Sequence, residues 1–126
     1  MKSYTDISQS KKLAEILPIE SADMYYCYGM DIYTKGWSFD DTPTIIDNSN
    51  RIDVHTDIPC WSLAALLGVL PDEVGDNHYL TLDKEGKEYC CCYEDNNGNS
   101  FRHCFSDNPV DACVEMILKL NELNLL

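Results

Sequence analysis

The sequence predicts an α+β domain in which about three helices pack on a mainly antiparallel sheet. The clearest observation lies between residues 78 and 106, where three alternating apolar and polar stretches are separated by two turn signals. This pattern is typical of a three-stranded C-terminal meander. In three other segments, apolar residues recur at helical spacing between capping residues and prolines. The length of 126 residues suits one hydrophobic core, so residues 1–126 are predicted to form a single α+β domain.

The first helix is predicted for residues 6–17, with Thr5 as its N-cap and an apolar stripe along one side. Pro18 ends this helix because proline cannot donate a backbone hydrogen bond. Residues 24–28 follow and are rich in aromatic side chains, which favours a strand with two apolar faces.

Residues 29–58 are the least regular third of the chain and contain many turn-forming residues. Short strands are predicted near residues 44–46 and 51–55. A loop of this length in a compact domain also indicates strands that the pattern does not reveal. Within the segment, Trp37 and Phe39 are expected to anchor the core.

A second helix is predicted between Asp57 and Pro71, because Pro59 suits a first helical turn and leucines recur at helical spacing. The third helix is predicted to begin at Pro109, with Asn108 as its N-cap. The leucine stripe of the second helix comprises Leu63, Leu66, Leu67 and Leu70.

The register of the meander follows from its two turns. If Asp83 opposes Lys87 and Asn96 opposes Asn99, one face of the sheet is largely apolar and is expected to face the core. In the same register, Cys91 and Cys104 lie directly opposite each other on the other face. The predicted core face comprises Leu80, Leu82, Cys90, Cys92, Phe101, His103 and Phe105.

Three consecutive cysteines stand in the middle strand of this meander. Successive side chains of a strand point to opposite faces, so Cys90 and Cys92 share one face and Cys91 lies on the other. The triplet lacks the paired Cys-x-x-Cys spacing of structural zinc sites, and we expect no metal and no cofactor. The alternative is a zinc site formed by Cys90, Cys92, His103 and His78, which would lie opposite Cys92.

Seven cysteines and the absence of an apolar N-terminal stretch predict a compartment for the protein. The odd number of cysteines argues against a complete disulfide framework. The first residues lack the apolar region of a signal peptide, and no apolar run is long enough to span a bilayer. We therefore expect a cytoplasmic protein with free thiols.

The net charge and the absence of catalytic motifs limit the classes of function that the protein can have. The formal net charge is −13, from 22 acidic and 9 basic residues, which argues against direct binding to nucleic acid or to anionic membranes. The same charge suits a protein partner with a basic surface. There is no P-loop, dinucleotide-binding glycine motif, metalloprotease motif or nucleophile elbow. These absences argue against an enzyme, and no catalytic residue is assigned.

Three segments of the chain carry a resemblance to other sequences. They are Gln9-Ser-Lys-Lys-Leu with Glu20-Ser-Ala-Asp-Met-Tyr25, then Ile58-Pro-Cys-Trp-Ser-Leu-Ala-Ala-Leu-Leu67, and finally Asn108-Pro-Val-Asp-Ala-Cys-Val-Glu-Met-Ile117. The chain resembles an uncharacterised family of small hypothetical proteins encoded by bacteriophages and mobile elements of gut bacteria. The resemblance implies a genetic context, and it points to a shared motif formed by Ala22, Asp23, Met24, Pro59, Trp61 and Ser62. The alternative is that these residues form a strand entrance and a helix start.

These observations lead to one functional hypothesis and two alternatives. The hypothesis is a small acidic accessory protein of phage or mobile-element type that acts in the host cytoplasm by binding another protein. The first alternative is a small thiol- or zinc-dependent enzyme. The second is a nucleic-acid mimic that blocks a DNA-binding host protein.

Overall fold

The computed structural model describes residues 1–126, and its contacts divide the chain into two compact units. The N-terminal unit comprises residues 4–65, and the C-terminal unit comprises residues 1–3 and 66–126. Helices and antiparallel sheets are both present, which confirms the predicted α+β class. None of the helices combines the length and the hydrophobicity needed to cross a membrane. The single-domain assignment stays a prediction.

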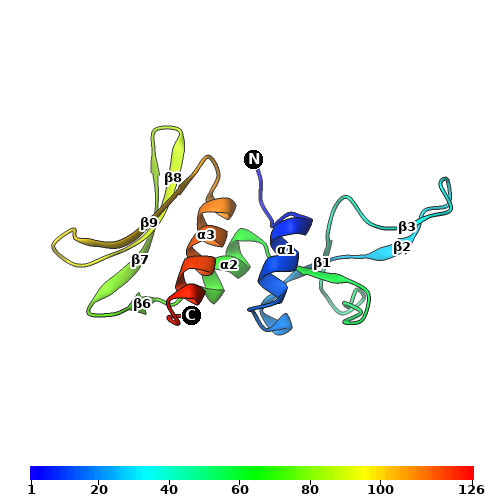
Figure 1. Ribbon diagram of the computed structural model, residues 1–126. Coiled ribbons are helices and arrows are strands. Elements are labelled where there is room, and N and C mark those ends of the chain that lie inside the picture. The colour runs from blue at the N-terminus through cyan, green and yellow to red at the C-terminus, as the bar shows by residue number, and fades with distance from the viewer. The chain divides into compact units, whose positions relative to one another are not determined.

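The C-terminal unit contains a four-stranded antiparallel sheet in the order β6-β7-β8-β9 (Figure 1). The predicted meander is confirmed as its last three strands. The additional strand β6 has only two residues, too few to show alternation in the sequence. The strands are β6 (Glu73–Val74), β7 (His78–Glu85), β8 (Glu88–Glu94) and β9 (Ser100–Ser106).

The predicted register between β8 and β9 is confirmed, because Cys91 pairs with Cys104 and Cys92 pairs with His103. The turn between these strands contains Gly98 with a φ of 79°, a conformation that glycine adopts without strain. An irregularity between Tyr93 and Glu94 shifts the pairing near the turn.

The predicted register between β7 and β8 is wrong. Both strands continue to a tight turn, so that Glu85 pairs with Glu88 and Asp83 pairs with Cys90. The turn places Gly86 at a φ of 62°, as a short hairpin with glycine first in the loop requires. Because the shift from the predicted pairing is an odd number of residues, it exchanges the two faces of β7.

The corrected register also corrects the predicted core face. Leu80 and Leu82 now lie opposite Tyr93 and Cys91, on the face that helix α3 (Pro109–Glu122) covers. Cys91 on this face and Cys113 of α3 are both fully buried. On the opposite face, which was predicted to face the core, Cys90 and Cys92 are buried as predicted, but Phe101, His103 and Phe105 are exposed because α3 packs on the other side of the sheet.

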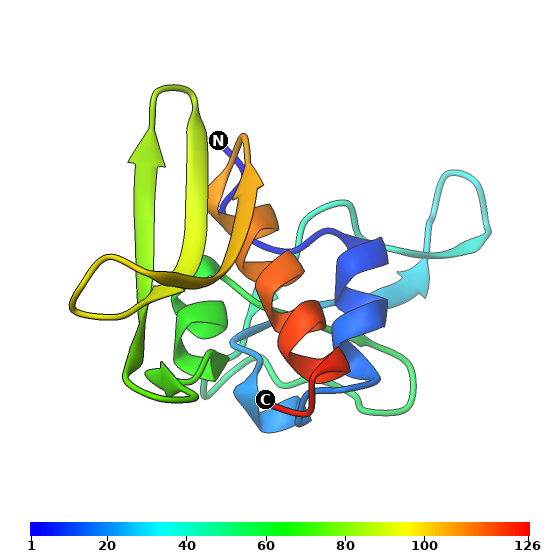
Figure 2. The same ribbon diagram turned by 60° about the vertical axis from the view of Figure 1, so that its left-hand side comes forward.

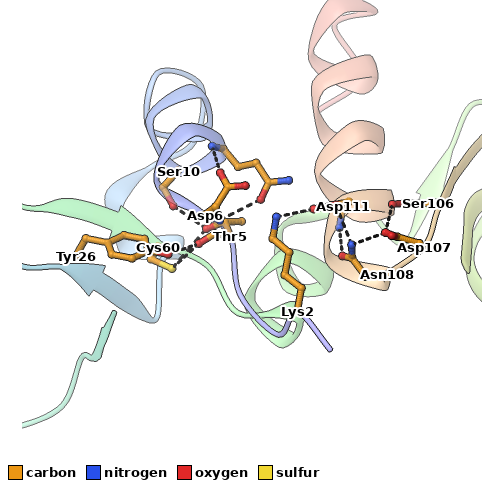
Figure 3. A network of polar contacts seen from close by, with 11 residues as sticks. Lys2, Thr5, Asp6, Ser10, Tyr26, Cys60, Ser106, Asp107, Asn108 and Asp111 are labelled. Atoms are coloured by element: carbon orange, nitrogen blue, oxygen red, sulfur yellow. Dashed lines mark hydrogen bonds and ion pairs between the residues drawn. The ribbon is translucent and has the colours of Figure 1, made fainter. Parts of the chain in front are cut away.

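Helix α3 begins as the sequence predicts. The side chain of Asn108 accepts a hydrogen bond from the backbone N–H of Asp111 at 2.9 Å, and Pro109 occupies the first turn. Lys2 forms an ion pair with Asp111 at 2.8 Å (Figure 3). An acidic residue in the first turn also complements the positive end of the helix dipole.

In the N-terminal unit, helix α1 (Ile7–Ala14) begins one residue later than predicted, with Asp6 rather than Thr5 as its N-cap. Asp6 accepts from the backbone of Gln9 while the Gln9 side chain accepts from the backbone of Asp6, which is a capping box. Thr5 is fully buried instead, and its hydroxyl lies 2.7 Å from that of Ser10 (Figure 3). A short 3₁₀ helix, η1 (Ile19–Ser21), follows.

A three-stranded antiparallel sheet lies beside α1, in the order β4-β1-β5. The prediction of a helix from Asp57 is wrong, because residues 58–60 form β5 and helix α2 (Leu63–Val69) begins only afterwards. Pro59 is tolerated there since β5 is an edge strand, where a missing N–H costs no ladder bond. The strands are β1 (Met24–Tyr26), β4 (Thr44–Ile45) and β5 (Ile58–Cys60).

Strands β2 (Tyr28–Met30) and β3 (Trp37–Phe39) form a separate two-stranded hairpin. It extends away from α1 and β1 (Figure 2). The irregular third of the sequence therefore contains two strands that were not predicted. The strand predicted near residues 44–46 is confirmed as β4, whereas residues 51–55 form no strand. Phe39 packs against the core cluster, but Trp37 is 61 % exposed, which corrects its predicted role as a core anchor.

Candidate functional site

The β2–β3 hairpin has one apolar face. Tyr28 pairs with Phe39 and Met30 pairs with Trp37, and directly opposed residues of two antiparallel strands share a face. The intervening pair, Gly29 with Ser38, occupies the other face and contributes little side-chain bulk. We call residues 28–39 the aromatic hairpin.

The aromatic face is ordered by ring contacts, and apart from Phe39, which packs against the core cluster, its side chains are exposed. The Tyr28 ring lies 5.8 Å from that of Trp37 and 4.8 Å from that of Phe39, centroid to centroid. At the tip, Ile32 and Tyr33 are 78 % and 89 % exposed. Soluble proteins scatter single exposed apolar residues, whereas contiguous groups mark interaction sites.

Hydrogen bonds fix the hairpin at its base and at its tip. At the base, the carboxylate of Asp57 accepts from the backbone N–H of Tyr28 at 3.0 Å. At the tip, the carboxylate of Asp31 accepts from the N–H of Tyr33 at 2.8 Å, and Lys35 adopts a positive φ of 55° to close the turn. The exposed side chains are therefore held on an ordered backbone.

The surroundings of the aromatic hairpin are acidic. An open hollow of about 430 Å³ lies along it, and Asp31, Asp40 and Asp41 line this hollow together with Met30 and Phe39. The N-terminal unit as a whole carries ten acidic and four basic residues. An apolar face with an acidic rim matches a partner surface that is apolar at its centre and basic around it.

The structure brings the two parts of the predicted shared motif together. The carboxylate of Asp23 accepts hydrogen bonds from the backbone N–H of Ser62, at 2.9 Å, and from the Ser62 hydroxyl. The indole N–H of Trp61 donates to the hydroxyl of Ser21 at 2.9 Å. The Ser62 hydroxyl in turn accepts from the N–H of Ala65 and caps α2.

Two of the remaining motif residues, Met24 and Pro59, lie on the paired strands β1 and β5. Met24 pairs with Cys60 across β1 and β5, and Pro59 pairs with Tyr25. Ala22 is buried and ends η1. All these contacts are those of a strand entrance and a helix start, the structural alternative for this motif.

The predicted metal ligands come together only in part. Cys90, Cys92 and His103 share one face of β8 and β9, and their ligand atoms all lie within 4.8 Å of one another. His103 Nδ1 is 3.5 Å from the sulfur of Cys90. The sulfur of Cys92 lies 2.9 Å from the hydroxyl of Thr81 and 3.4 Å from the carboxylate of Glu94.

His78 does not belong to this group, because it pairs with Val74 and Thr81 takes the predicted place opposite Cys92. The His78 ring lies 5.9 Å from that of Phe101, and its buried Nδ1 has no hydrogen-bond partner. The predicted position opposite Cys92 depended on the wrong β7–β8 register.

The cysteines of the C-terminal sheet are not activated as nucleophiles. Burial raises the pKa of Cys90 and raises that of Cys92 to about 12. The hydrogen bond with Cys113, together with burial, raises the pKa of Cys91. Since the thiolate is the reactive form, these thiols should react slowly at neutral pH, which argues against the thiol-enzyme alternative.

Comparison with protein-family models, with curated proteins and with solved structures finds no match to the chain. The functional interpretation therefore rests on geometry. Sequence reasoning missed the aromatic hairpin, although a signal was present: Tyr28-Gly-Met30 and Trp37-Ser-Phe39 both alternate bulky apolar with small residues around a turn.

Proposed function

We propose that this protein is an acidic accessory protein that binds another protein through the aromatic hairpin. The single observation that carries the proposal is the exposed apolar face of the hairpin, on which Trp37 and Met30 are 61 % and 55 % exposed. The sequence resemblance extends the proposal to an accessory protein of phage or mobile-element type that acts in the host cytoplasm.

The composition of this face suits an interface centre. Tryptophan and tyrosine are enriched among the residues that dominate binding energy, because they bury much apolar surface at a small entropic cost. Tyr28 and Trp37 on the face and Tyr33 at the tip supply these side chains, and ring contacts limit the freedom of Tyr28 and Trp37 before binding. Less conformational entropy is then lost on association.

Charge defines the class of partner. The formal net charge of −13 speeds the encounter with a basic surface and opposes association with a second copy of the same chain. The aspartates beside the hairpin place part of this charge next to the apolar face. The proposed partner is a protein with an apolar pocket and a basic rim.

Affinity capture tests the proposal. The immobilised protein is compared with a hairpin variant, Met30→Ser with Trp37→Ser, and with a control variant, Ile45→Ser with Val54→Ser. The control removes exposed apolar side chains from the same unit outside the hairpin. A partner that wild type and control retain, and that the hairpin variant loses, supports the proposal. Equal capture of the same proteins by all three would refute it.

A further inference from the structure

The second feature of interest is the group formed by Cys90, Cys92 and His103 in the C-terminal unit. Two sulfurs and an imidazole nitrogen lie on one face of a sheet, and each can ligate a transition metal. Cys90 and Cys92 are buried, whereas His103 is exposed, so the group is reached from the solvent side. This combination gives a group of soft sulfur and nitrogen ligands that a metal ion can reach from solvent.

The backbone explains why these three side chains meet. Cys90 and Cys92 are two residues apart on β8 and therefore point to the same face. His103 of β9 lies directly opposite Cys92 and diagonally opposite Cys90. Its ring is stacked on that of Phe105 at 5.6 Å with an interplanar angle of 4°, which holds Nδ1 toward the Cys90 sulfur.

The distances agree with tetrahedral zinc. Bonds of about 2.3 Å to sulfur and about 2.0 Å to nitrogen place a ligating sulfur and nitrogen about 3.5 Å apart, and two sulfurs about 3.8 Å apart. The observed distance from Cys90 Sγ to His103 Nδ1 is 3.5 Å, and the three ligand atoms lie within 4.8 Å of one another. The limit of 4.8 Å exceeds the zinc-bound distances by about 1 Å, so the ligand atoms must move closer together to coordinate one ion.

We propose that Cys90, Cys92 and His103 bind one zinc ion that ties β8 to β9. Glu94, whose carboxylate lies 3.4 Å from the Cys92 sulfur, stands beside the fourth position, which a carboxylate oxygen or water can fill. The zinc site stabilises the C-terminal sheet because the folded chain alone presents the three ligands together. It is independent of the aromatic hairpin.

Two variants and two controls test the site. His103→Ala removes a proposed ligand whose exposure should let the fold persist, while Cys90→Ser with Cys92→Ser removes both sulfurs. His55→Ala and Cys27→Ser are matched controls, since His55 is exposed and Cys27 is partly exposed in the other unit. The reduced full-length proteins are titrated with Zn²⁺ and, as a spectroscopic probe, with Co²⁺.

The expected result is about one zinc per chain in wild type and controls, a thiolate-to-cobalt charge-transfer band, and a melting temperature that rises with Zn²⁺. His103→Ala should lower the zinc affinity more than about 100-fold, because mutation of an outer-shell partner costs about 10- to 100-fold. X-ray absorption should show two sulfurs at about 2.3 Å from zinc. Absence of zinc binding by the wild type, or unchanged affinity in His103→Ala, would overturn the proposal.

Discussion

The carboxylate of Asp23 accepts a hydrogen bond from the backbone N–H of Ser62 at 2.9 Å. This contact joins the residue that precedes β1 to the residue that caps α2, although they are far apart in the sequence. Two of the segments that carry the sequence resemblance are thus joined by hydrogen bonds between Asp23 and Ser62, which we call the Asp23–Ser62 joint. Its contacts explain the residue types without a catalytic role.

Removal of this joint should destabilise the protein. Asp23→Ala leaves the N–H of Ser62 without its acceptor and should lower the free energy of unfolding by about 1–3 kcal/mol. Ser62→Ala removes the N-cap as well as a donor to Asp23, and about 0.5–2 kcal/mol is expected. Urea unfolding measures both changes. Glu20→Ala, an exposed acid, is the control, and an equal loss in this control would contradict the assignment.

The two tryptophans should respond differently to a fluorescence quencher. Trp61 is fully buried and hydrogen-bonded to Ser21, whereas Trp37 is 61 % exposed on the aromatic hairpin. Acrylamide should quench a large part of the wild-type fluorescence and little of that of Trp37→Phe. Strong quenching in Trp37→Phe while the protein remains folded would show that the hairpin is not the exposed element.

Alkaline pH should destabilise the C-terminal unit. Burial raises the pKa of Cys104 from 9.0 to about 11 in the folded protein. Below pH 9 the thiol is protonated in both the folded and the unfolded state, and its contribution to stability is complete. As the pH rises from 9 to 11, the thiol ionises in the unfolded state before it ionises in the folded state, which lowers the free energy of the unfolded state. The free energy of unfolding should fall across this range.

Cys104→Ala supplies the control for this pH dependence. The variant loses packing at all pH values, but its unfolding free energy should fall less steeply between pH 9 and pH 11 because the titrating group is gone. Urea unfolding at several pH values gives both curves. Parallel curves would contradict the assigned pKa.

Parts of this fold follow from the sequence and parts do not. The third helix and the β8–β9 register were predicted correctly, because Asn108 and the Asn96–Asn99 turn are strong local signals. The β7–β8 register was wrong, since Lys84-Glu-Gly-Lys87 permits several turn positions and an odd shift exchanges the faces. Burial of Cys90 and Cys92 was predicted correctly, but with the wrong neighbours.

The candidate sites, too, were predicted from the sequence only in part. Three of the four predicted zinc ligands gather because their placement depends only on strand alternation and the β8–β9 register. The fourth, His78, depended on the mistaken register. The strands of the aromatic hairpin have three residues each, so their alternation of bulky and small residues is only a weak signal, and the exposure of the hairpin depends on packing that no local pattern specifies.

The most direct test of the proposed function is the affinity of a captured partner for the wild type and for the hairpin variant, measured by isothermal titration calorimetry. Loss of Met30 and Trp37 should weaken binding by at least about 30-fold, as expected for central interface residues. The Ile45→Ser, Val54→Ser control should bind like the wild type. Equal affinity of wild type and hairpin variant for the partner would contradict the proposal that the aromatic hairpin is the binding site.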